Sequence, residues 1–395
     1  MAESDRAPLW EQLPLWDWPI EAEAGPAEPR PPRQPIVRRP ASIPHVSVAE
    51  REPAVAEALG VVSRSLAEMA ATETRPLLDE PPRRHRLRPF GDTDLSVFPI
   101  ALGGATFGWT ASPESTMRIL DGYAEAGGNF LDTADRYAAG RSEMLIGNWL
   151  KDRGNRDRIV LSTKIGRGAE FPGLSAQNIL RAAEASLRRL QVEHVDLLHF
   201  ALDDLEVPLE ESLTAADALL RAGKVRHVAA SGFSPERLME ARVTAGQLLL
   251  PRFAGIQAHY SLLTREGFER SLLPVAQAQG LAVVPYLALE SGFLTGKYRS
   301  RGRDSKASDA HSRSKHVEQH RTKKGFRVLA VLEDVAAQQG VSPATTALAW
   351  LLTKPLVTAP VVSASRPEQV RDLVQAATVH LTRAQVAALD RATAY

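Results

Sequence analysis

The sequence of 395 residues contains no cysteine, which excludes disulfides, thiolate catalysis and cysteine-based metal sites. It has no apolar run of the ~20 residues that a membrane-spanning helix needs, and its opening, MAESDRAPLW, lacks the basic and then apolar pattern of a signal peptide. It also lacks a charge excess, because 48 Lys and Arg are matched by 47 Asp and Glu. We therefore expect a cytoplasmic protein with no general affinity for nucleic acid or for a membrane.

Proline is distributed unevenly along the chain. Of the 27 prolines, 15 occur at or before Pro89. Proline fixes φ and removes a hydrogen-bond donor, so residues 1–89 are predicted to form a largely disordered, flexible N-terminal extension. Within it, apolar residues spaced by three and four predict an amphipathic helix near residues 53–70. Three of the six tryptophans also lie in this arm, either as a segment that docks on the barrel or on a protein partner, or as incidental hydrophobic content.

After this arm, short β-rich runs alternate with stretches of helical period. Eight such runs in roughly 270 residues match the size of a (β/α)₈ barrel. A doubly wound sheet shares this alternation, but the number of runs favours the barrel, so we expect a (β/α)₈ TIM barrel over residues 90–395. The expected strands are 100–103, 129–132, 159–164, 195–201, 225–231, 255–258, 282–286 and 358–362.

Helix starts carry consistent signals in the same region. A serine followed by proline supplies both an N-cap hydroxyl and a residue suited to the first helical position. A threonine followed three residues later by glutamine is typical of a capping box. The helix N-termini predicted in this way are at Ser112, Ser234, Ser342 and Thr382.

Two charged residues end neighbouring expected strands. In a parallel barrel the functional groups belong at the C-terminal ends of the strands, and Asp132 and Lys164 both lie there. A lysine that ends an apolar strand needs an anion, which Asp132 is placed to supply. These two residues taken alone are equally consistent with an ion pair that only fixes the strand ends.

Longer segments resemble the aldo-keto reductase family, in family order over nearly the whole chain after residue 90. The resemblance implies the (β/α)₈ fold and the reduction of a carbonyl compound with a nicotinamide nucleotide. The N-terminal arm has no counterpart in the family. The segments that carry the resemblance are residues 102–150, LSTKIG at 161–166, SLRRLQVEHVDLL at 186–198, GKVRHVAASGFSPERL at 223–238, ESGFLTGKY at 290–298 and VVSASRPEQV at 361–370.

The resemblance assigns three catalytic residues: Asp132, Tyr137 and Lys164. In such enzymes the tyrosine protonates the carbonyl oxygen, the lysine ammonium favours the phenolate that results, and the aspartate holds the lysine in place. The fourth member of the family's tetrad, a histidine, is replaced by Ala201. His199 lies two residues earlier on the same face of the strand, roughly 6–7 Å deeper, where filling the barrel interior is its simplest use. Loss of a positioned hydrogen-bond donor predicts either slower turnover or a substrate that needs no second donor.

The resemblance also assigns a nicotinamide pocket. Ser231 and Gln257 match residues that hold the carboxamide, and Tyr286 matches the aromatic residue that stacks on the ring. Gly232 stands where the family usually has asparagine.

On the adenine side, the match comprises Ser365, Arg366 and Gln369, whereas Leu373 replaces a usual asparagine. A guanidinium suits a 2′-phosphate, so Arg366 favours NADPH, with NADH as the alternative. Gly292 belongs to a loop that is expected to pass close to the pyrophosphate, although an ordinary turn glycine would look the same.

A basic stretch follows the seventh expected strand. Residues 299–327 contain ten Lys and Arg, three His and three acids, which predicts a solvated, mobile loop. The spacing of its histidines does not indicate a metal site, so we expect none.

Together these observations predict an NADPH-dependent oxidoreductase that reduces an aldehyde or ketone, a small-molecule substrate that the sequence does not specify. The alternative is a regulatory or scaffold protein that binds the nucleotide with little catalysis, which the replacements at Ala201, Gly232 and Leu373 favour.

Overall fold

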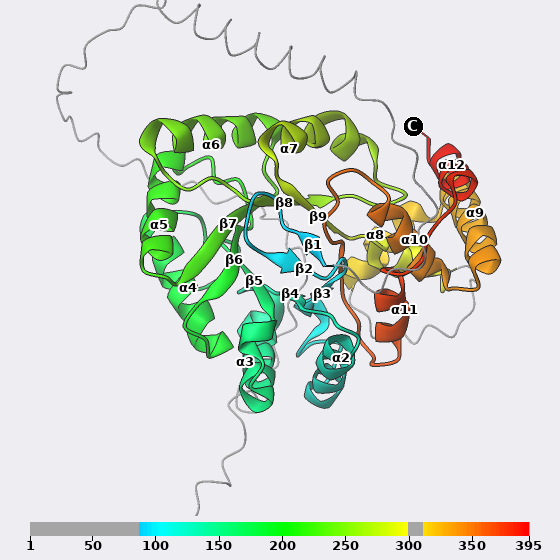
Figure 1. Cartoon of the computed structure of the whole chain (residues 1–395), viewed down its shortest axis with the longest axis horizontal. Coiled ribbons are helices and arrows are strands. Elements are labelled where there is room, and N and C mark those ends of the chain that lie inside the picture. Colours follow the sequence, from blue (N-terminus) through cyan, green and yellow to red (C-terminus); the bar gives the residue numbers. More distant parts are fainter. Residues whose placement is uncertain (1–86, 299–310, 395) are drawn as a thin grey trace, which may run out of the picture. The chain divides into compact units, whose positions relative to one another are not determined.

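The computed structural model describes residues 87–298 and 311–394. The predicted N-terminal extension, its amphipathic helix and its tryptophan-bearing segment fall almost wholly outside these residues. Within them, the expected barrel is confirmed. Eight parallel strands form one sheet in the order β10-β3-β4-β5-β6-β7-β8-β9, with helices around it (Figure 1). The strands are β3 (Ala101–Gly103), β4 (Phe130–Asp132), β5 (Val160–Ile165), β6 (Val195–Phe200), β7 (Val225–Ser231), β8 (Gly255–His259), β9 (Ala282–Tyr286) and β10 (Val361–Val362).

The barrel closes between β9 and the segment that leads into β10. The Thr358 amide donates to the Val283 carbonyl at 2.8 Å, and the Val283 amide donates to Leu356 at 3.0 Å. The eighth strand is shorter than the predicted 358–362, because Pro360 has no amide hydrogen to donate to a ladder. Closure removes the free edges of the sheet and brings the C-terminal ends of all eight strands to one rim.

The predicted helix N-termini are confirmed. The side chains of Ser112, Ser234 and Ser342 each accept from the amide three residues on, and Thr382 forms a capping box with Gln385. The helices are α2 (Pro113–Glu125), α3 (Arg141–Arg153), α4 (Ala176–Leu190), α5 (Leu209–Arg221), α6 (Pro235–Leu248), α7 (Leu273–Gln279), α8 (His311–His320), α9 (Lys323–Gln339), α10 (Pro343–Leu352), α11 (Gln369–Gln375) and α12 (Arg383–Ala392). Among the residues described, no helix is both long and apolar enough to cross a bilayer.

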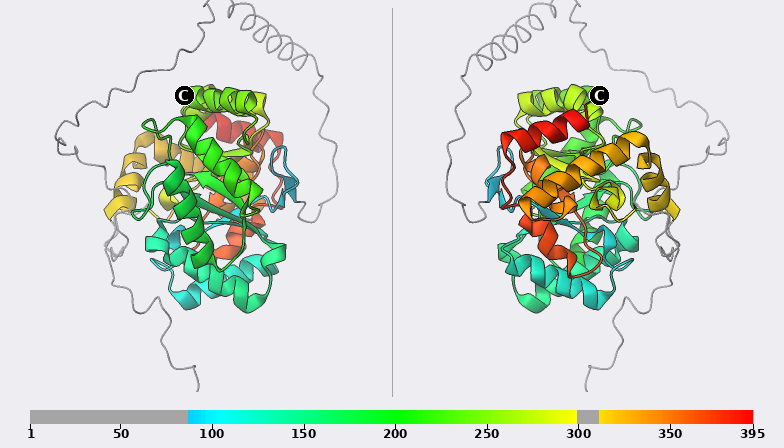
Figure 2. Two further views of the ribbon diagram at one scale, coloured as in Figure 1. Left: turned by 90° about the vertical axis from the view of Figure 1, so that its left-hand side faces the viewer. Right: turned by 90° about the vertical axis from the view of Figure 1, so that its right-hand side faces the viewer.

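A hairpin that the sequence did not predict covers the N-terminal end of the barrel. Its strands are β1 (Arg88–Pro89) and β2 (Ser96–Val97), drawn in blue in the side views (Figure 2). Phe90 in its turn packs edge-on against Phe130, with ring centroids 5.9 Å apart. The hairpin thus covers the N-terminal end of the barrel with apolar side chains. The polar side chains that end the strands lie at the opposite, C-terminal rim.

The expectation of a mobile loop over residues 299–327 is wrong for the part that the structure describes. Residues 311–320 form α8, and α9 begins at Lys323. Thr322 caps α9 by accepting from the Gly325 amide, and Val317 is buried. The high charge of this stretch concealed a helix that packs through only a few apolar and histidine side chains.

Candidate active site

The C-terminal ends of β4 and β5 carry a buried ion pair. Lys164 is 6% exposed and donates to the Asp132 carboxylate and, at 2.8 Å, to the Thr133 carbonyl. Asp132 is fully buried. The strands are adjacent and in parallel register, so the two side chains reach each other inside the barrel mouth.

The second oxygen of the Asp132 carboxylate is also fully used. Ser162 donates to Oδ1 at 3.0 Å, and Gln257, from the distant strand β8, donates to the same atom at 2.6 Å. With both oxygens bonded, the carboxylate has one orientation, and it fixes the position of the lysine ammonium.

The ion pair keeps Lys164 charged. Burial alone lowers the pKa of Lys164, but the charge of Asp132 and then of Tyr137 raise it, and the net direction is upward. A buried ammonium group with a well-defined position therefore persists across the working pH range.

Tyr137 lies directly beside this ammonium. It begins η5 (Tyr137–Gly140), and the Lys164 Nζ is 5.3 Å from the centroid of its ring. The next two residues, Ala138 and Ala139, have φ values of 49° and 54°, a left-handed conformation that alanine rarely adopts. These two residues lie between β4 and the start of α3 at Arg141.

His199 fills the barrel interior, as its place in β6 suggested. It is fully buried, and its Nδ1 lies 3.0 Å from the Ser162 hydroxyl. Its Nε2 is also buried and has no hydrogen-bond partner among the described residues. Burial lowers the pKa of His199 to about 3, so the imidazole is neutral. Among the described residues its side chain is hydrogen-bonded to Ser162 inside the barrel.

The residues expected to hold the nicotinamide come from neighbouring strands. Ser231 ends β7 and lies opposite Gln257 in the β7–β8 register. Tyr286 ends β9, and one face of its ring stacks on His259 at 5.6 Å with an interplanar angle of 21°. Gly232 has φ of +73°, and a Cβ built there would make ordinary van der Waals contacts, the nearest at 3.7 Å.

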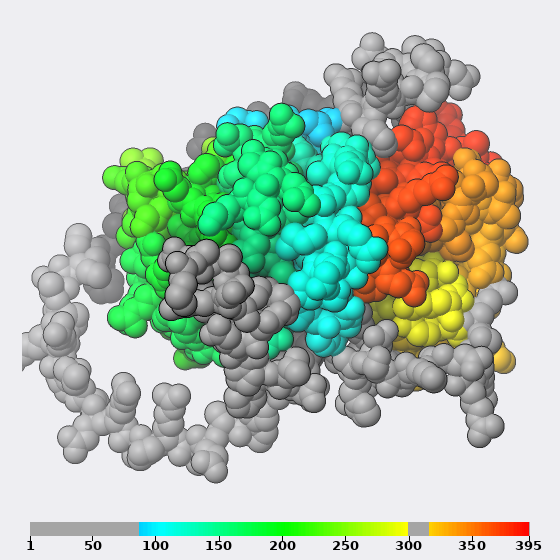
Figure 3. Space-filling view, turned by 90° about the horizontal axis from the view of Figure 1, so that it is seen from below, coloured from blue at the N-terminus to red at the C-terminus, as the bar shows by residue number. Residues whose placement is uncertain are grey.

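The residues expected on the adenine side also lie together. The amides of Ser365 and Arg366 both donate to the Gln369 side chain, at 2.8 and 3.0 Å, while the Arg366 side chain is exposed. Gly292 has φ of +90° in the segment after β9. This segment (yellow) lies beside the one that follows β10 (orange-red) on one face of the barrel (Figure 3). Leu373, where the family usually has asparagine, is buried in the core.

Comparison with known proteins agrees with this arrangement. The sequence profile described as the Aldo/keto reductase family matches residues 99–394. The chain belongs to this family. An uncharacterized oxidoreductase of Bacillus subtilis, YrpG, is 33% identical over 309 residues, which cover 74% of this chain and 91% of that protein.

Other relatives in the aldo/keto reductase family differ in what their names describe. The norsolorinic acid reductase stcV of Emericella nidulans is 31% identical over 74% of this chain and 77% of its own length. A putative voltage-gated potassium channel subunit beta of Schizosaccharomyces pombe is 33% identical over 75% of this chain and 89% of its own length. Relatives of this aldo/keto reductase thus include both named reductases and a named channel subunit.

Sequence reasoning missed a second, half-buried carboxyl group beside the catalytic candidates. Asp135 has a buried Oδ1 with no hydrogen-bond partner among the described residues. Burial, and then the charge of Glu143, raise the pKa of Asp135 to about 7. Glu143 is itself buried and accepts from Thr163 at 2.5 Å and from Arg189 at 2.7 Å. The only sign of this carboxyl group in the sequence was the position of Asp135, two residues before the candidate catalytic Tyr137.

Replacing Asp135 with Asn is expected to stabilise the protein above neutral pH. The ordinary pKa of an aspartate is about 3.9, so between about pH 4 and 7 the folded state binds more protons than the unfolded state, and stability falls as pH rises. Asparagine cannot ionise, so it removes this loss. We expect a gain in the free energy of unfolding of about 1–3 kcal/mol at pH 8, a range that is reduced because the side chain keeps some contact with solvent. Urea denaturation at pH 5 and pH 8 measures it, with the exposed Asp152→Asn as control. An equal effect of Asp135→Asn at both pH values would contradict the assignment.

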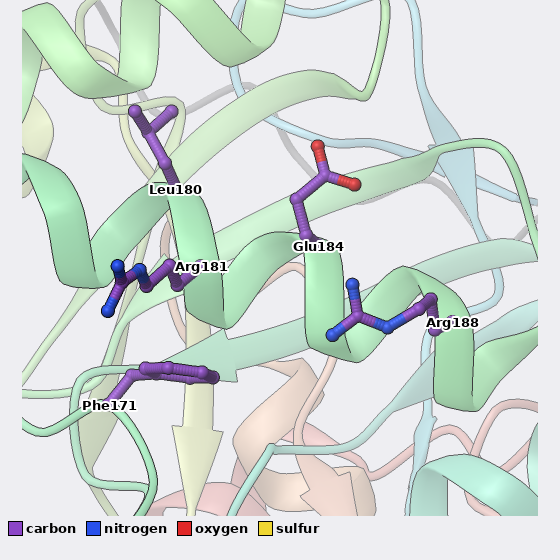
Figure 4. A pocket seen from close by; sticks show the side chains of 5 residues that line it. All are labelled: Phe171, Leu180, Arg181, Glu184 and Arg188. Carbon is purple, nitrogen blue, oxygen red and sulfur yellow. The ribbon is translucent and has the colours of Figure 1, made fainter.

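A surface pocket lies elsewhere, on α4 and the loop before it. It is lined by Phe171, Leu180, Arg181, Glu184 and Arg188, whose side chains project from α4 and that loop (Figure 4). None of the candidate catalytic or nucleotide-binding residues lines it, so we do not associate it with the reaction of this aldo/keto reductase.

Proposed function

We propose that this protein is an NADPH-dependent reductase of an aldehyde or ketone, with Tyr137 as the proton donor. The observation that carries the proposal is the buried Lys164–Asp132 pair, whose ammonium lies 5.3 Å from the Tyr137 ring centroid at the C-terminal rim of the barrel. Groups at that rim are the ones that meet a substrate in this fold.

The chemistry of the proton follows from these neighbours. The Tyr137 hydroxyl donates its proton to the carbonyl oxygen, and the phenolate that remains is stabilised by the Lys164 ammonium beside it. Asp132 does not meet the substrate. It is buried, with both oxygens bonded, and keeps the ammonium in place through the reaction.

A bound nicotinamide dinucleotide would supply the hydride that reduces the carbonyl carbon. Ser231 and Gln257 would hold its carboxamide, and the Tyr286 ring at the end of β9 would stack on the nicotinamide. Gln257 already donates to Asp132, so the same side chain would link nucleotide binding to the catalytic pair.

The preference for NADPH depends on the segment after β10. Arg366 presents an exposed guanidinium beside Ser365, and a guanidinium binds a phosphate through two parallel hydrogen bonds. Gln369 holds the backbone of both residues, which fixes the loop that would meet the adenosine 2′-phosphate. Gly292, in the segment after β9, would allow the backbone to approach the pyrophosphate.

The test is nicotinamide absorbance decay with purified full-length protein, NADPH or NADH, and a panel of aldehydes and ketones. If NADPH is consumed only when a carbonyl compound and an intact Tyr137 are both present, the reductase proposal is supported, and the rates rank the substrates. NADPH binding in a parallel titration without consumption would favour the second candidate, a nucleotide-binding regulatory protein. The relative named as a channel subunit and the replacements at Ala201 and Gly232 favour that candidate.

Restoring the missing donor is expected to raise the rate. Ala201→His places an imidazole at the rim, and because a positioned donor is worth about 10²–10³ in rate, partial recovery predicts a gain of about tenfold in kcat. His199→Ala, by contrast, should leave kcat per folded molecule unchanged, since His199 is buried below the rim. A loss in the second variant and no gain in the first would instead identify His199 as the donor.

A further inference from the structure

A buried carboxylate beside the proposed nicotinamide pocket is surrounded by histidines. Glu290 begins η8 (Glu290–Thr295), the segment after β9, and its side chain has no exposed area. Three imidazoles point their Nε2 atoms at it, one from the end of β8 and two from α8. We call this group the Glu290 cluster: Glu290, His259, His316 and His320.

The distances within the Glu290 cluster are short and centre on the Glu290 carboxylate. Nε2 of His316 lies 2.7 Å and Nε2 of His320 lies 3.0 Å from the same oxygen, Oε2. Nε2 of His259 lies 3.1 Å from Oε1. One ligand atom from each of Glu290, His259 and His316 falls within 4.8 Å of the others. Ligands around a tetrahedral zinc ion are roughly 3.3 Å apart, so small side-chain rotations bring these atoms into range.

The backbone is arranged to direct this carboxylate inward. Glu290 has φ of 48° and Ser291 has φ of 53°, both in the left-handed region that residues other than glycine rarely adopt. Such a conformation persists only where the surroundings hold it. Here the Ser261 and Thr264 hydroxyls both donate to Oε1, the second at 2.8 Å. They orient Glu290 in the way that outer partners orient a metal ligand.

The two histidines of α8 are four residues apart, which places them on one face of a helix. Gln319 bonds to the Nδ1 of His316 at 2.8 Å, so His316 has an orienting partner on its far nitrogen. If the Gln319 amide group were flipped, its oxygen would accept a hydrogen bond from the Nδ1–H of His316, and the Nε2 of His316 would be the atom that binds the metal. The three imidazoles are 28%, 22% and 14% exposed, which leaves an ion a route from solvent to the buried carboxylate.

Charge favours a cation at this place. Burial raises the pKa of Glu290, but hydrogen bonds from His259, His316 and His320 outweigh it, and the net direction is downward, which leaves the carboxylate ionised. A buried carboxylate needs a positive partner. A divalent ion held between Glu290 and the imidazoles would be such a partner.

We propose that the Glu290 cluster binds one divalent transition-metal ion of the zinc type. Imidazole nitrogen and carboxylate oxygen are the ligands that zinc takes in proteins lacking cysteine ligands. Glu290, His259 and His316 would supply three of the ligands, and His320, whose Nε2 lies 3.0 Å from Oε2 of Glu290, would supply the fourth after a side-chain rotation. Four protein ligands around zinc are typical of a structural site, so we assign the ion a structural role.

Such an ion would join three separate parts of the barrel rim. It would link α8 to the end of β8 and to the segment after β9 that carries Gly292. His259 stacks on Tyr286, so the ion would also fix the back of the proposed nicotinamide pocket. The site was not expected from the sequence, because the spacing of the α8 histidines alone shows neither Glu290 nor His259.

Metal content is the direct test, and it does not depend on whether the protein is a reductase. Full-length protein without a polyhistidine tag is stripped with a chelator, titrated with zinc sulfate, desalted and measured by inductively coupled plasma mass spectrometry. We expect one zinc per chain. Glu290→Gln and His316→Gln should each weaken zinc binding by about a hundredfold, whereas the exposed His380→Gln should bind as the unaltered protein does.

Three further measurements distinguish a metal site from a misfolded variant. Circular dichroism establishes that each variant is folded, and His316→Gln changes only a partly exposed side chain. Substitution with Co²⁺ should give the intense visible absorption of a tetrahedral site, which both cluster variants should lack. A chelator should lower the Tm of the unaltered protein by several degrees and leave that of His316→Gln unchanged. No zinc uptake by the full chain, or equal uptake by folded cluster variants, overturns the proposal in favour of a hydrogen-bonded clamp without metal.

Discussion

Replacing Tyr137 with Phe is expected to abolish carbonyl reduction while leaving NADPH binding intact. The substitution removes one hydroxyl and keeps the ring beside Lys164. General acid catalysis by a positioned side chain contributes about 10²–10⁴ in rate, and the loss should appear in kcat because proton transfer occurs only in the chemical step. The ring is not among the residues proposed to hold the nucleotide, so the Kd for NADPH should change little.

Single-turnover kinetics and a fluorescence titration with NADPH separate these two effects. Tyr298→Phe is the matched control, because it removes a tyrosine hydroxyl from a ring that lies near Lys297 instead of Lys164. It should retain most of the rate. If Tyr137→Phe kept full rate, another group would be the proton donor and the proposed mechanism would be wrong. If it lost nucleotide binding as well, Tyr137 would have a structural role in the pocket.

Replacing Lys164 with Met is expected to reduce both activity and stability. The substitution leaves the buried Asp132 carboxylate without its cation, and breaking a buried ion pair from one side costs about 3–5 kcal/mol. The rate should fall together with stability, because the phenolate of Tyr137 loses the neighbouring charge. Asp132→Asn combined with Lys164→Met removes both charges, so the double variant should be more stable than the sum of the single variants predicts.

The pH dependence gives a second readout of the same pair. The pKa of Lys164 is raised in the folded state, so its stabilising contribution is complete below the unfolded pKa of about 10.4 and is lost as pH rises through the higher folded pKa. Urea denaturation should therefore show a loss of stability at strongly alkaline pH that Lys164→Met lacks. Arg153→Met, which breaks an exposed pair with Asp121, is the control and should change stability little, because surface ion pairs are screened by solvent. If Lys164→Met lowered the free energy of unfolding as little as Arg153→Met does, the buried pair would not have the stabilising role proposed here.

The sequence determined the fold, because the fold depends on repeated local signals. Eight apolar runs and four helix caps, Ser112 and Thr382 among them, each report a local preference that the barrel satisfies. The predicted strand ends agree with the observed ones to within a few residues. The hairpin at Phe90 was missed, since two strands of two residues leave no periodic pattern.

The sequence also identified the candidate catalytic residues, because Asp132, Tyr137 and Lys164 lie in short continuous motifs next to strand ends. The sequence indicated that Asp132 and Lys164 would pair, because they end neighbouring strands, and the register of β4 and β5 brings them together. It did not indicate that Gln257 donates to Asp132, because these residues are 125 positions apart and meet only once the barrel is closed.

Tertiary structure alone decided the remaining chemistry. The raised pKa of Asp135 comes from burial, which depends on everything packed around the side chain. The Glu290 cluster draws on the end of one strand, a left-handed turn after the next and a helix whose charged sequence predicted a loop. Local propensity fixes which elements form. Which side chains converge is fixed by barrel closure and by backbone angles at a few positions, and neither leaves a local signal in the sequence.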